Sequence, residues 1–440
     1  MKTKFIWSVA IHSIAVSFLA NCYLLIQRFP GSLYALVPLF LLACIFSGAA
    51  WVNAPTSRSC LHGTILLYAF LVALAVSILF HIPLALLTIP GNYMTLVWSG
   101  VVCASVLFVV FWVGILCVYL TSAQLGFKLR LRGLLCGLIP VYNLIVLSAI
   151  LKTVTEECLY EMEKDQCNKQ RKDQQLCATK YPILLVHGVF FRDTKLLNYW
   201  GRIPWELQFH GAKIFYGNQP SALSIADSAA VLKTRILEIL EQTGEEKVNI
   251  IAHSKGGLDC RYAIANLGIG DRVASLTTVN TPHRGCQFAD YLLTKVPEDF
   301  KNKVANTYNA ALRKLGEKEA DFLAAVNDLT DSHCKQLDAQ MPTPEGVLCQ
   351  SIGSVLSSAN SGIFPLSLSY HLVNYFSGEN DGLVSEDSFA WGEKYTLLRT
   401  SGKKGISHSD IIDLTRENIP EFDVREFYVE LVSDLKNRGL

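Results

Sequence analysis

The first third of the chain has no acidic residue. From Met1 to Thr155 the sequence contains no aspartate or glutamate and only eight basic residues. A folded soluble domain of this length needs a charged surface. The scarcity of charged residues therefore excludes a soluble domain in this part of the chain. The other 31 basic residues face all 38 acidic ones, which gives residues 156–440 a net charge of about −7. The total of +1 therefore averages two different parts, of which the first predicts a membrane domain.

The sequence also lacks a cysteine pattern typical of a metal site or a disulfide framework. Thirteen cysteines are scattered along the chain, and six lie at or before Cys136. An odd number cannot pair completely, and no spacing matches a zinc site. We expect reduced thiols, of which those in apolar segments act as small hydrophobes. Residues 156–440 lack a basic excess as well, so we expect no nucleic-acid partner.

Long apolar runs dominate the first part. A membrane-spanning helix needs about 20 apolar residues, and four uncharged runs reach that length: Phe5–Gln27, Leu33–Val52, Gly63–Ile89 and Tyr93–Leu120. Because further runs follow the first, we interpret it as a retained span rather than a signal peptide. A fifth, shorter run, Gly133–Leu151, contains Pro140 and Asn143. It either spans, or lies re-entrant or interfacial.

Basic residues in the loops indicate an orientation. They lie at the N-terminus, in the 53–62 loop and in the 121–132 loop, as Lys2, Lys4, Arg58, Lys128, Arg130 and Arg132. The 28–32 loop holds one basic residue and the 90–92 loop none. This alternation places the N-terminus and the 121–132 loop inside. The side of the C-terminal part then depends on whether the fifth run spans, which the sequence leaves open.

The second part alternates between buried strands and amphipathic helices. The expected strands are Pro182–Gly188, Ala212–Tyr216, Lys247–Ala252, Val273–Asn280, Tyr370–Phe376 and Tyr395–Arg399, and the expected helices include Ile225–Gln242 and Leu258–Leu267. Such alternation predicts a parallel sheet with both faces covered by helices. In such sheets, ligands bind at the carboxyl ends of the strands. The predicted fold is therefore an α/β domain that follows an all-α transmembrane domain.

The segment NIIAHSKGGLDC at residues 249–260 places Ser254 between an expected strand and an expected helix. A serine on a sharp strand-to-helix turn projects its hydroxyl from the top of the sheet. Such a turn crowds the positions two before and two after the serine, and Ala252 and Gly256 are small. His253 is the neighbouring histidine, but strand alternation points it elsewhere. Ser254 is therefore the candidate nucleophile.

A serine nucleophile needs a base that is oriented by an acid. The histidines after Ser254 in the soluble part are His283, His333, His371 and His408. The segment Gly378–Ser385, with sequence GENDGLVS, resembles the acid loop of the triacylglycerol lipases, a family of α/β-hydrolases. The segment Ser407–Asp410, with sequence SHSD, resembles their histidine loop. The resemblance implies an α/β-hydrolase fold over residues 181–440, with Asp381 as the acid and His408 as the base.

Two further motifs support this resemblance. His187-Gly188-Val189 resembles the oxyanion loop of these lipases, which implies that the backbone amides of Val189 and Lys255 stabilise the oxyanion. The segment Asn280–Gly285 resembles a stretch that borders the site in bacterial lipases, and His283 within it is interpreted as structural or substrate-lining.

Asp410 matches a calcium-ligand position in the larger Pseudomonas-type lipases. The second ligand, expected four residues later, would be Leu414, whose side chain cannot coordinate calcium. We therefore predict no metal and no cofactor.

The stretch between His283 and Asp381 is longer than a connecting loop requires. Helical stripes such as Phe322, Leu323, Val326 and Leu329 occur in it. In the resembled lipases a mobile helical lid lies here, and a fixed cap is the alternative. The expected organisation is a transmembrane domain over 1–151, a polar linker over 152–180, and a hydrolase domain over 181–440 with the cap or lid at about 288–345.

The sequence thus predicts a multi-pass protein of the cell membrane that cleaves carboxylic ester bonds of lipid-like substrates through an acyl-enzyme. Acyl transfer by the same triad is one alternative, and a catalytically inactive membrane scaffold is another. The substrate partner is a lipid or an ester. The acyl chain length, the head group and the oligomeric state are left open.

Overall fold

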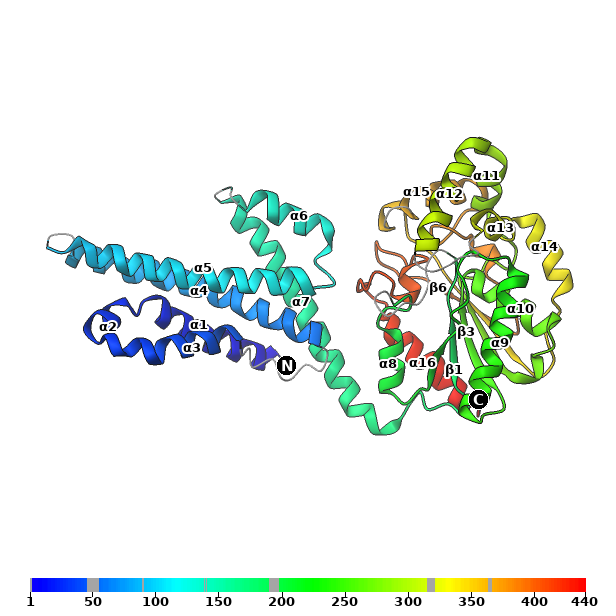
Figure 1. Cartoon of the computed structure of the whole chain (residues 1–440), viewed down its shortest axis with the longest axis horizontal. Helices are drawn as coiled ribbons and strands as arrows, with labels where there is room; N and C mark the ends of the chain where they lie inside the picture. The colour runs from blue at the N-terminus through cyan, green and yellow to red at the C-terminus, as the bar shows by residue number, and fades with distance from the viewer. Residues whose placement is uncertain are drawn as a thin grey trace. The chain divides into compact units, whose positions relative to one another are not determined.

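The computed structural model describes residues 2–45, 55–88, 91–137, 139, 141–189, 198–314, 321–362 and 366–440. The chain divides into two compact units, Met1–Gln170 and Arg171–Leu440 (Figure 1). All thirteen cysteines are free.

The N-terminal unit is entirely helical in its described part. Its helices are α1 (Lys2–Ala20), α2 (Tyr23–Arg28), α3 (Leu33–Ile45), α4 (Pro55–Thr88), α5 (Tyr93–Thr121), α6 (Gly126–Cys136) and α7 (Tyr142–Arg171). Among the described residues, three segments are long and apolar enough to cross a membrane: Lys2–Ala20, Ser57–Leu87 and Tyr93–Thr121. They correspond to the first, third and fourth predicted runs. Residues 46–52 of the second run and Ile89 of the third lie outside the described residues.

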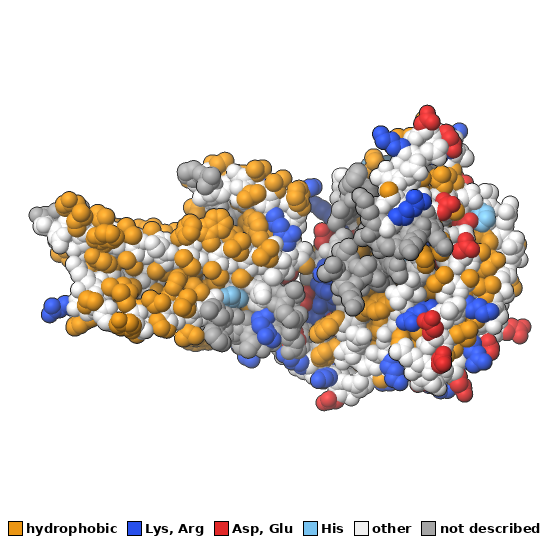
Figure 2. Space-filling view, in the orientation of Figure 1, with side chains coloured by type: hydrophobic (Ala, Val, Ile, Leu, Met, Phe, Trp, Pro, Cys, Tyr) orange, Lys and Arg blue, Asp and Glu red, His pale blue; other side chains and the backbone are white. Residues whose placement is uncertain are grey.

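Two glycines allow α4 and α5 to approach closely. A Cβ on Gly63 would lie 2.6 Å from the carbonyl oxygen of Gly114, and one on Gly114 would lie 3.0 Å from Cγ of Leu67. Small residues are typical of helix contacts in membrane proteins, where backbone proximity supplies the packing energy. Elsewhere this unit presents apolar side chains outward, whereas charges of both signs cover the second unit (Figure 2).

The fifth apolar run does not form one helix. α6 ends at Cys136 and α7 begins at Tyr142, while Pro140 lies outside the described residues. Between the helices, Val141 has φ of 68°. α7 then continues without a break through the polar stretch to Arg171. A prolonged helix therefore occupies most of the segment expected to be a linker.

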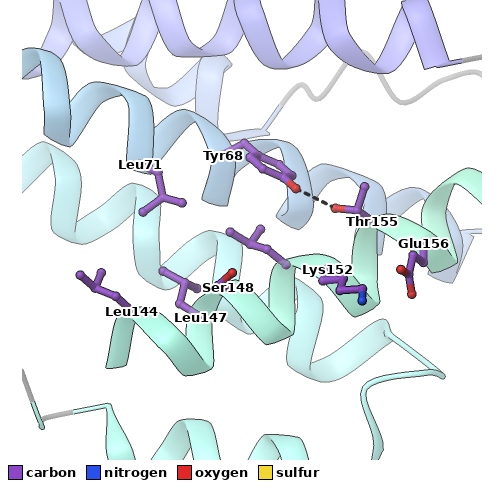
Figure 3. A pocket seen from close by; sticks show the side chains of 9 residues that line it. Tyr68, Leu71, Leu144, Leu147, Ser148, Lys152, Thr155 and Glu156 are labelled. Carbon is purple, nitrogen blue, oxygen red and sulfur yellow. Dashed lines mark hydrogen bonds between the residues drawn. The ribbon is translucent and has the colours of Figure 1, made fainter. Parts of the chain in front are cut away.

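α4 and α7 enclose a groove of about 520 Å³ (Figure 3). The hydroxyl groups of Tyr68 and Thr155 are 3.2 Å apart beside it. The groove has an apolar part and a polar part, and its lining residues are Tyr68, Leu71, Leu144, Leu147, Ser148, Leu151, Lys152, Thr155 and Glu156.

The second unit is built on a six-stranded sheet whose strands are all parallel. The strands are β1 (Ile183–Val186), β2 (Ile214–Tyr216), β3 (Val248–His253), β4 (Val273–Val279), β5 (Leu348–Ser354) and β6 (Lys394–Leu398). Their order across the sheet is β2-β1-β3-β4-β5-β6. The chain order reverses direction beside β1, so the carboxyl ends of β1 and β3 form the switch point at which ligands bind in such sheets.

One predicted strand is wrong and one strand was missed. Tyr370–Phe376 lies within helix α15 (Leu366–Ser377), which buries Leu366, Ser369 and Val373 at helical spacing. The missed strand β5 contains polar residues and so does not form an apolar run. Its Gln350 side chain donates to Thr277 Oγ1 at 2.9 Å and its Ser351 hydroxyl donates to the Trp391 carbonyl at 2.7 Å. These bonds satisfy polar groups that burial would otherwise penalise.

Helices cover both faces of the sheet (Figure 1). α8 (Ile203–Phe209) and α16 (Val424–Asn437) pack on one face through a cluster that includes Ile183, Ile251 and Tyr428. α9 (Ile225–Thr243) and α10 (Lys255–Asn266) pack on the other face. The predicted helical insertion contains α11 (Gln287–Lys295), α12 (Glu298–Lys314), α13 (Phe322–Asn327) and α14 (Asp331–Gln340).

Two contacts join the first and last segments of this unit, and the second lies beside the amino end of β1. The Arg171 guanidinium donates to both carboxylate oxygens of Glu426 on α16, at 2.5 and 2.8 Å. The Lys180 amide donates to the carbonyl of Leu440 at 2.8 Å. The second bond therefore brings the last residue of the chain to the amino edge of the sheet.

Ile251 should be a major contributor to the stability of this unit, because it is fully buried at the centre of the sheet. We expect Ile251→Ala to lower the free energy of unfolding by about 2–5 kcal/mol and Ile251→Val by only about 0.5–1.5 kcal/mol. The measurement is the urea midpoint from pulse proteolysis of the full chain in detergent. Equal midpoints for the two variants would contradict close packing at this position.

Candidate active site

Ser254 sits on a strained turn between β3 and α10. Its φ and ψ are 54° and −133°, values that non-glycine residues rarely adopt and that functional sites often retain. A Cβ on Gly256 would lie 2.4 Å from the carbonyl oxygen of His187, and one on Gly257 would lie 2.2 Å from Thr281 Oγ1. The glycines after Ser254 therefore permit contacts that no larger residue allows, as the turn requires.

Two strands hold this turn at the switch point of the sheet. The Ser254 amide donates to the Val279 carbonyl at the end of β4, at 2.9 Å. On the other side, a Cβ on Gly188 would lie 2.7 Å from Cβ of Ser254. The segment after β1 thus packs directly against the candidate nucleophile.

Asp381 and His408 are in direct contact. His408 Nδ1 lies 2.6 Å from Asp381 Oδ2, and the His408 amide donates to the Asp381 carbonyl at 2.9 Å. The Asp381 side chain is fully buried. Its other oxygen, Oδ1, accepts from the amides of Leu383 and Val384 at 2.9 and 2.8 Å. A buried carboxylate with these donors is suited to fix the orientation and tautomer of an imidazole.

Asn280 also contacts Asp381 and had no assigned role in the sequence analysis. Its Nδ2 donates to Asp381 Oδ2 at 2.7 Å and to Ser354 Oγ at 2.8 Å. Its φ of 44° is unusual for a non-glycine residue. Two features of the sequence could have indicated a role for Asn280: it directly follows β4, and it begins a segment that resembles one in bacterial lipases. Asn280 joins the ends of β4 and β5 to the candidate acid.

Ser254 and His408 lie on adjoining segments, but they are not hydrogen-bonded in the described part of the chain. The ring of His408 lies 4.5 Å from that of His253, which precedes Ser254. Such bonds are often long in the absence of substrate. Ser254 is partly exposed, whereas His253 is buried. The carboxyl edge of the sheet therefore brings together all three predicted residues.

His253 and Tyr199 shape the segment after β1. The Gly188 amide donates to the Tyr199 hydroxyl oxygen at 3.0 Å, and that oxygen lies 2.6 Å from His253 Nδ1. Burial, assisted by the neighbouring His408, holds the pKa of His253 well below its ordinary value, which favours the neutral imidazole. Tyr199 lies in no recognised motif, and sequence reasoning did not find it.

The two amides predicted to form an oxyanion hole belong to Val189 and Lys255. In the part of the chain that the structure describes, neither amide donates a hydrogen bond. Lys255 is the first residue of α10, where helix amides point at the space beyond the N-terminus. Both amides are therefore available to a developing anion.

The Lys255 side chain takes no part in this edge of the sheet. Its ammonium donates to Asp259 Oδ1 at 2.7 Å and to Ser228 Oγ at 3.0 Å, and both charged side chains are buried. Burial raises the pKa of Asp259 to about 7, although the nearby ammonium opposes the shift. The pair is part of the α9–α10 packing, so Lys255 can serve the site only through its backbone.

The remaining candidate histidines have other surroundings. His283 is buried between Arg261 and Thr278, at 3.0 Å from each, and stacks on Trp391. Burial, assisted by Arg261, holds the pKa of His283 well below its ordinary value. His333 Nε2 lies 3.2 Å from Asp328.

The carboxylate of Asp410, which the resemblance had suggested as a calcium ligand, binds the loop that carries the candidate base. Its Oδ2 accepts from the amide and hydroxyl of Ser407, at 3.1 and 2.7 Å. The residue therefore supports the His408 loop.

Comparison with known proteins identifies the family. The alpha/beta hydrolase fold family matches residues 181–348. A triacylglycerol lipase of Vibrio cholerae is 36% identical over 288 residues, which cover 60% of this chain and 89% of the lipase. A triacylglycerol lipase of Pseudarthrobacter phenanthrenivorans is 29% identical over 309 residues, which cover 55% of this chain and 96% of the lipase. The solved mature lipase BlEst2 of Bacillus licheniformis has 22% identity and a TM-score of 0.42, and covers 58% of this chain and 92% of its own. The chain belongs to the triacylglycerol lipase family of α/β-hydrolases.

Proposed function

We propose that this lipase-type enzyme is a membrane-anchored serine hydrolase that cleaves carboxylic esters of lipid-like substrates. Ser254 is the nucleophile, His408 the general base and Asp381 the residue that orients the imidazole. The contact between His408 Nδ1 and Asp381 Oδ2, beside the strained Ser254 turn, is the observation that carries the proposal.

The proposed reaction follows from these positions. Ser254 Oγ attacks the ester carbonyl while His408 Nε2 takes the hydroxyl proton. The carbonyl oxygen becomes an oxyanion near the amides of Val189 and Lys255. Collapse of the tetrahedral intermediate breaks the bond to the alkoxy oxygen, which leaves as the alcohol with the proton from His408. Water then attacks the acyl-enzyme, with His408 again as base, and the carboxylic acid departs.

Exposed apolar side chains on α11, α12 and α15 favour a lipid-like substrate. On α15, which packs on α11, Leu368, Tyr375 and Phe376 are exposed, and Tyr375 keeps 82% of its surface. Tyr291 on α11 and Phe300 on α12 are exposed as well. Clusters of large exposed apolar side chains mark surfaces that bind apolar partners.

Membrane anchoring is supported by the composition of the N-terminal unit. Three of its helices are long and apolar enough to cross a bilayer, and their outward residues are mostly apolar. An anchor of this kind keeps the enzyme where lipid substrates partition, which reduces the search for substrate to two dimensions.

The first test is covalent labelling of Ser254. A fluorophosphonate probe should label the wild-type chain and fail to label Ser254→Ala, and kcat on a soluble ester should fall by about 10⁴-fold or more. The control is Ser433→Ala on α16, which should keep wild-type labelling. Equal labelling of Ser254→Ala and the wild type would remove the proposed nucleophile.

The second test concerns the acid. Asp381→Asn keeps the size of the side chain but favours the wrong imidazole tautomer, so we expect kcat to fall by about 10⁴-fold with little change in KM. Asp387→Asn, an exposed neighbour in the same loop, should retain full activity. Steady-state kinetics on one ester compares the two, and a larger loss for Asp387→Asn would show that the acid is misassigned.

The third test concerns the anchor. A chain that begins at Arg171 retains the ion pair with Glu426 and should hydrolyse a soluble short-chain ester at the rate of the full chain. Its rate on lipid in vesicles should be much lower, because it no longer concentrates at the membrane. Equal vesicle rates for the two chains would contradict a role of the anchor in catalysis.

A further inference from the structure

The two helices on either side of the break in the fifth apolar run share a polarity gradient. We call residues 126–157 the α6–α7 hairpin. On α6, the basic residues Lys128, Arg130 and Arg132 precede two strongly exposed leucines. On α7, exposed apolar residues come first and charged residues begin at Lys152. Both arms therefore carry charged residues at the base, where Phe127 on α6 is also exposed, and only uncharged residues at the tip, where the exposed apolar residues are Leu134 (73%), Leu135 (67%), Ile139, Val141 (71%), Leu144 and Ile145.

The base of the hairpin is fixed to the C-terminal end of α5. Glu157 on α7 accepts from the Ser122 hydroxyl at 2.5 Å and from the amides of Ala123 and Gln124 at 2.8 and 3.3 Å. On the other arm, the Arg130 guanidinium donates to the Ser122 carbonyl at 2.5 Å. Both arms thus start at the level where the apolar sequence of α5 ends.

The hairpin is too short to cross a bilayer. The apolar part of α7, residues 142–151, is ten residues long and spans about 15 Å at 1.5 Å per residue. This is about half of the 30 Å hydrocarbon core of a bilayer. The depth of the hairpin can be compared with the length of α4. Leu144 and Leu147 line the groove together with Leu71 of α4, and α4 continues beyond Leu71 to Thr88. Accordingly, the tip stops short of the far ends of α4 and α5 (Figure 1).

The groove beside α7 shows the same gradient. Its apolar end is formed by Leu71, Leu144 and Leu147, and its polar end includes Lys152 and Glu156 (Figure 3). Charged side chains in contact with lipid tails are costly, so the level of Lys152 marks the transition from hydrocarbon to head groups.

We infer that the α6–α7 hairpin is a re-entrant element that inserts its apolar tip into one leaflet and returns to the side from which it entered. Its partner is the lipid of that leaflet: acyl chains contact the tip, and anionic head groups contact the exposed Lys128 and Arg132 at the base. The inference rests on the proposed membrane anchoring by α4 and α5.

The side of the catalytic unit follows from this geometry. α5 carries the chain from the α4–α5 turn across the membrane to Ser122. Because the hairpin does not cross, the chain beyond Lys152 stays on the side of Ser122. The basic residues at the hairpin base place this side in the cytoplasm. The hydrolase unit therefore lies on the cytoplasmic side, and the sidedness that the sequence left open is assigned.

Thiol labelling of the full chain tests the sidedness without using catalytic activity. Cys167 is the exposed native cysteine on α7, and Gly91 in the α4–α5 turn has open space around its Cα. A membrane-impermeant maleimide is applied to sealed right-side-out and inverted vesicles. We expect Cys167 to react many-fold more in inverted vesicles. In a Gly91→Cys, Cys167→Ser chain the introduced cysteine should show the reverse, and Cys167→Ser alone should supply the background.

Labelling of Cys167 and Gly91→Cys from the same side would overturn the inference, because the hairpin would then span. A Leu135→Cys variant, again with Cys167→Ser, tests the tip. It should resist the water-soluble maleimide from both sides until detergent is added, and prompt labelling would show that the tip lies in water. If alkaline carbonate released the chain from the vesicles, α4 and α5 would not be membrane-spanning, and the inference, which rests on that anchoring, would be overturned. Fluorophosphonate labelling of Ser254 would still report separately on the hydrolase.

Discussion

The buried carboxylate of Asp381 is the interaction on which the geometry of the candidate site depends. It gathers donors from three places in the chain: Asn280 after β4, its own loop at Leu383 and Val384, and His408 after β6. A buried unpaired carboxylate is costly, so each donor both stabilises the fold and fixes the position of a candidate site residue. Loss of any one of them would disturb the others, because low-dielectric hydrogen-bond networks act cooperatively.

The strained backbone of Ser254, like the Asp381 contacts, is held by segments that are distant in the sequence. The turn is held by the close approach of Gly188 to Cβ of Ser254, by that of Gly256 to the His187 carbonyl, and by the bond from the Ser254 amide to Val279. Strained positions persist only where surrounding structure determines them. The sheet supplies that surrounding structure, and the site lies where the strand order reverses.

Sequence reasoning found what depends on local pattern and missed what depends on partners. The small residues around Ser254 and the buried runs of β1, β3 and β4 follow from backbone sterics and burial, and they were predictable. β5 was missed because Gln350 and Ser351 are buried through hydrogen bonds that no pattern reveals. The segment 370–376 is helical because α15 buries Leu366, Ser369 and Val373 at helical spacing, although its aromatic content suggested a strand. The roles of Asn280 and Tyr199 arise only when distant segments meet. In the N-terminal part, the sequence left open whether the run Gly133–Leu151 forms one membrane-spanning helix. Its apolar composition fits such a helix as well as it fits the break that the structure has between α6 and α7.

The ends of the hydrolase unit and its candidate site lie at opposite edges of the sheet, and this separation affects how the unit can be joined to another domain. The start of the hydrolase unit and the last residue of the chain meet at the amino edge, where the Lys180 amide donates to the Leu440 carbonyl, whereas Ser254, Asp381 and His408 lie at the carboxyl edge. Addition or loss of the helical unit consequently requires no rearrangement around the candidate triad. Relatives that match only 55–60% of the chain fit this modular plan, in which the attachment point of one domain is insulated from the chemistry of the other.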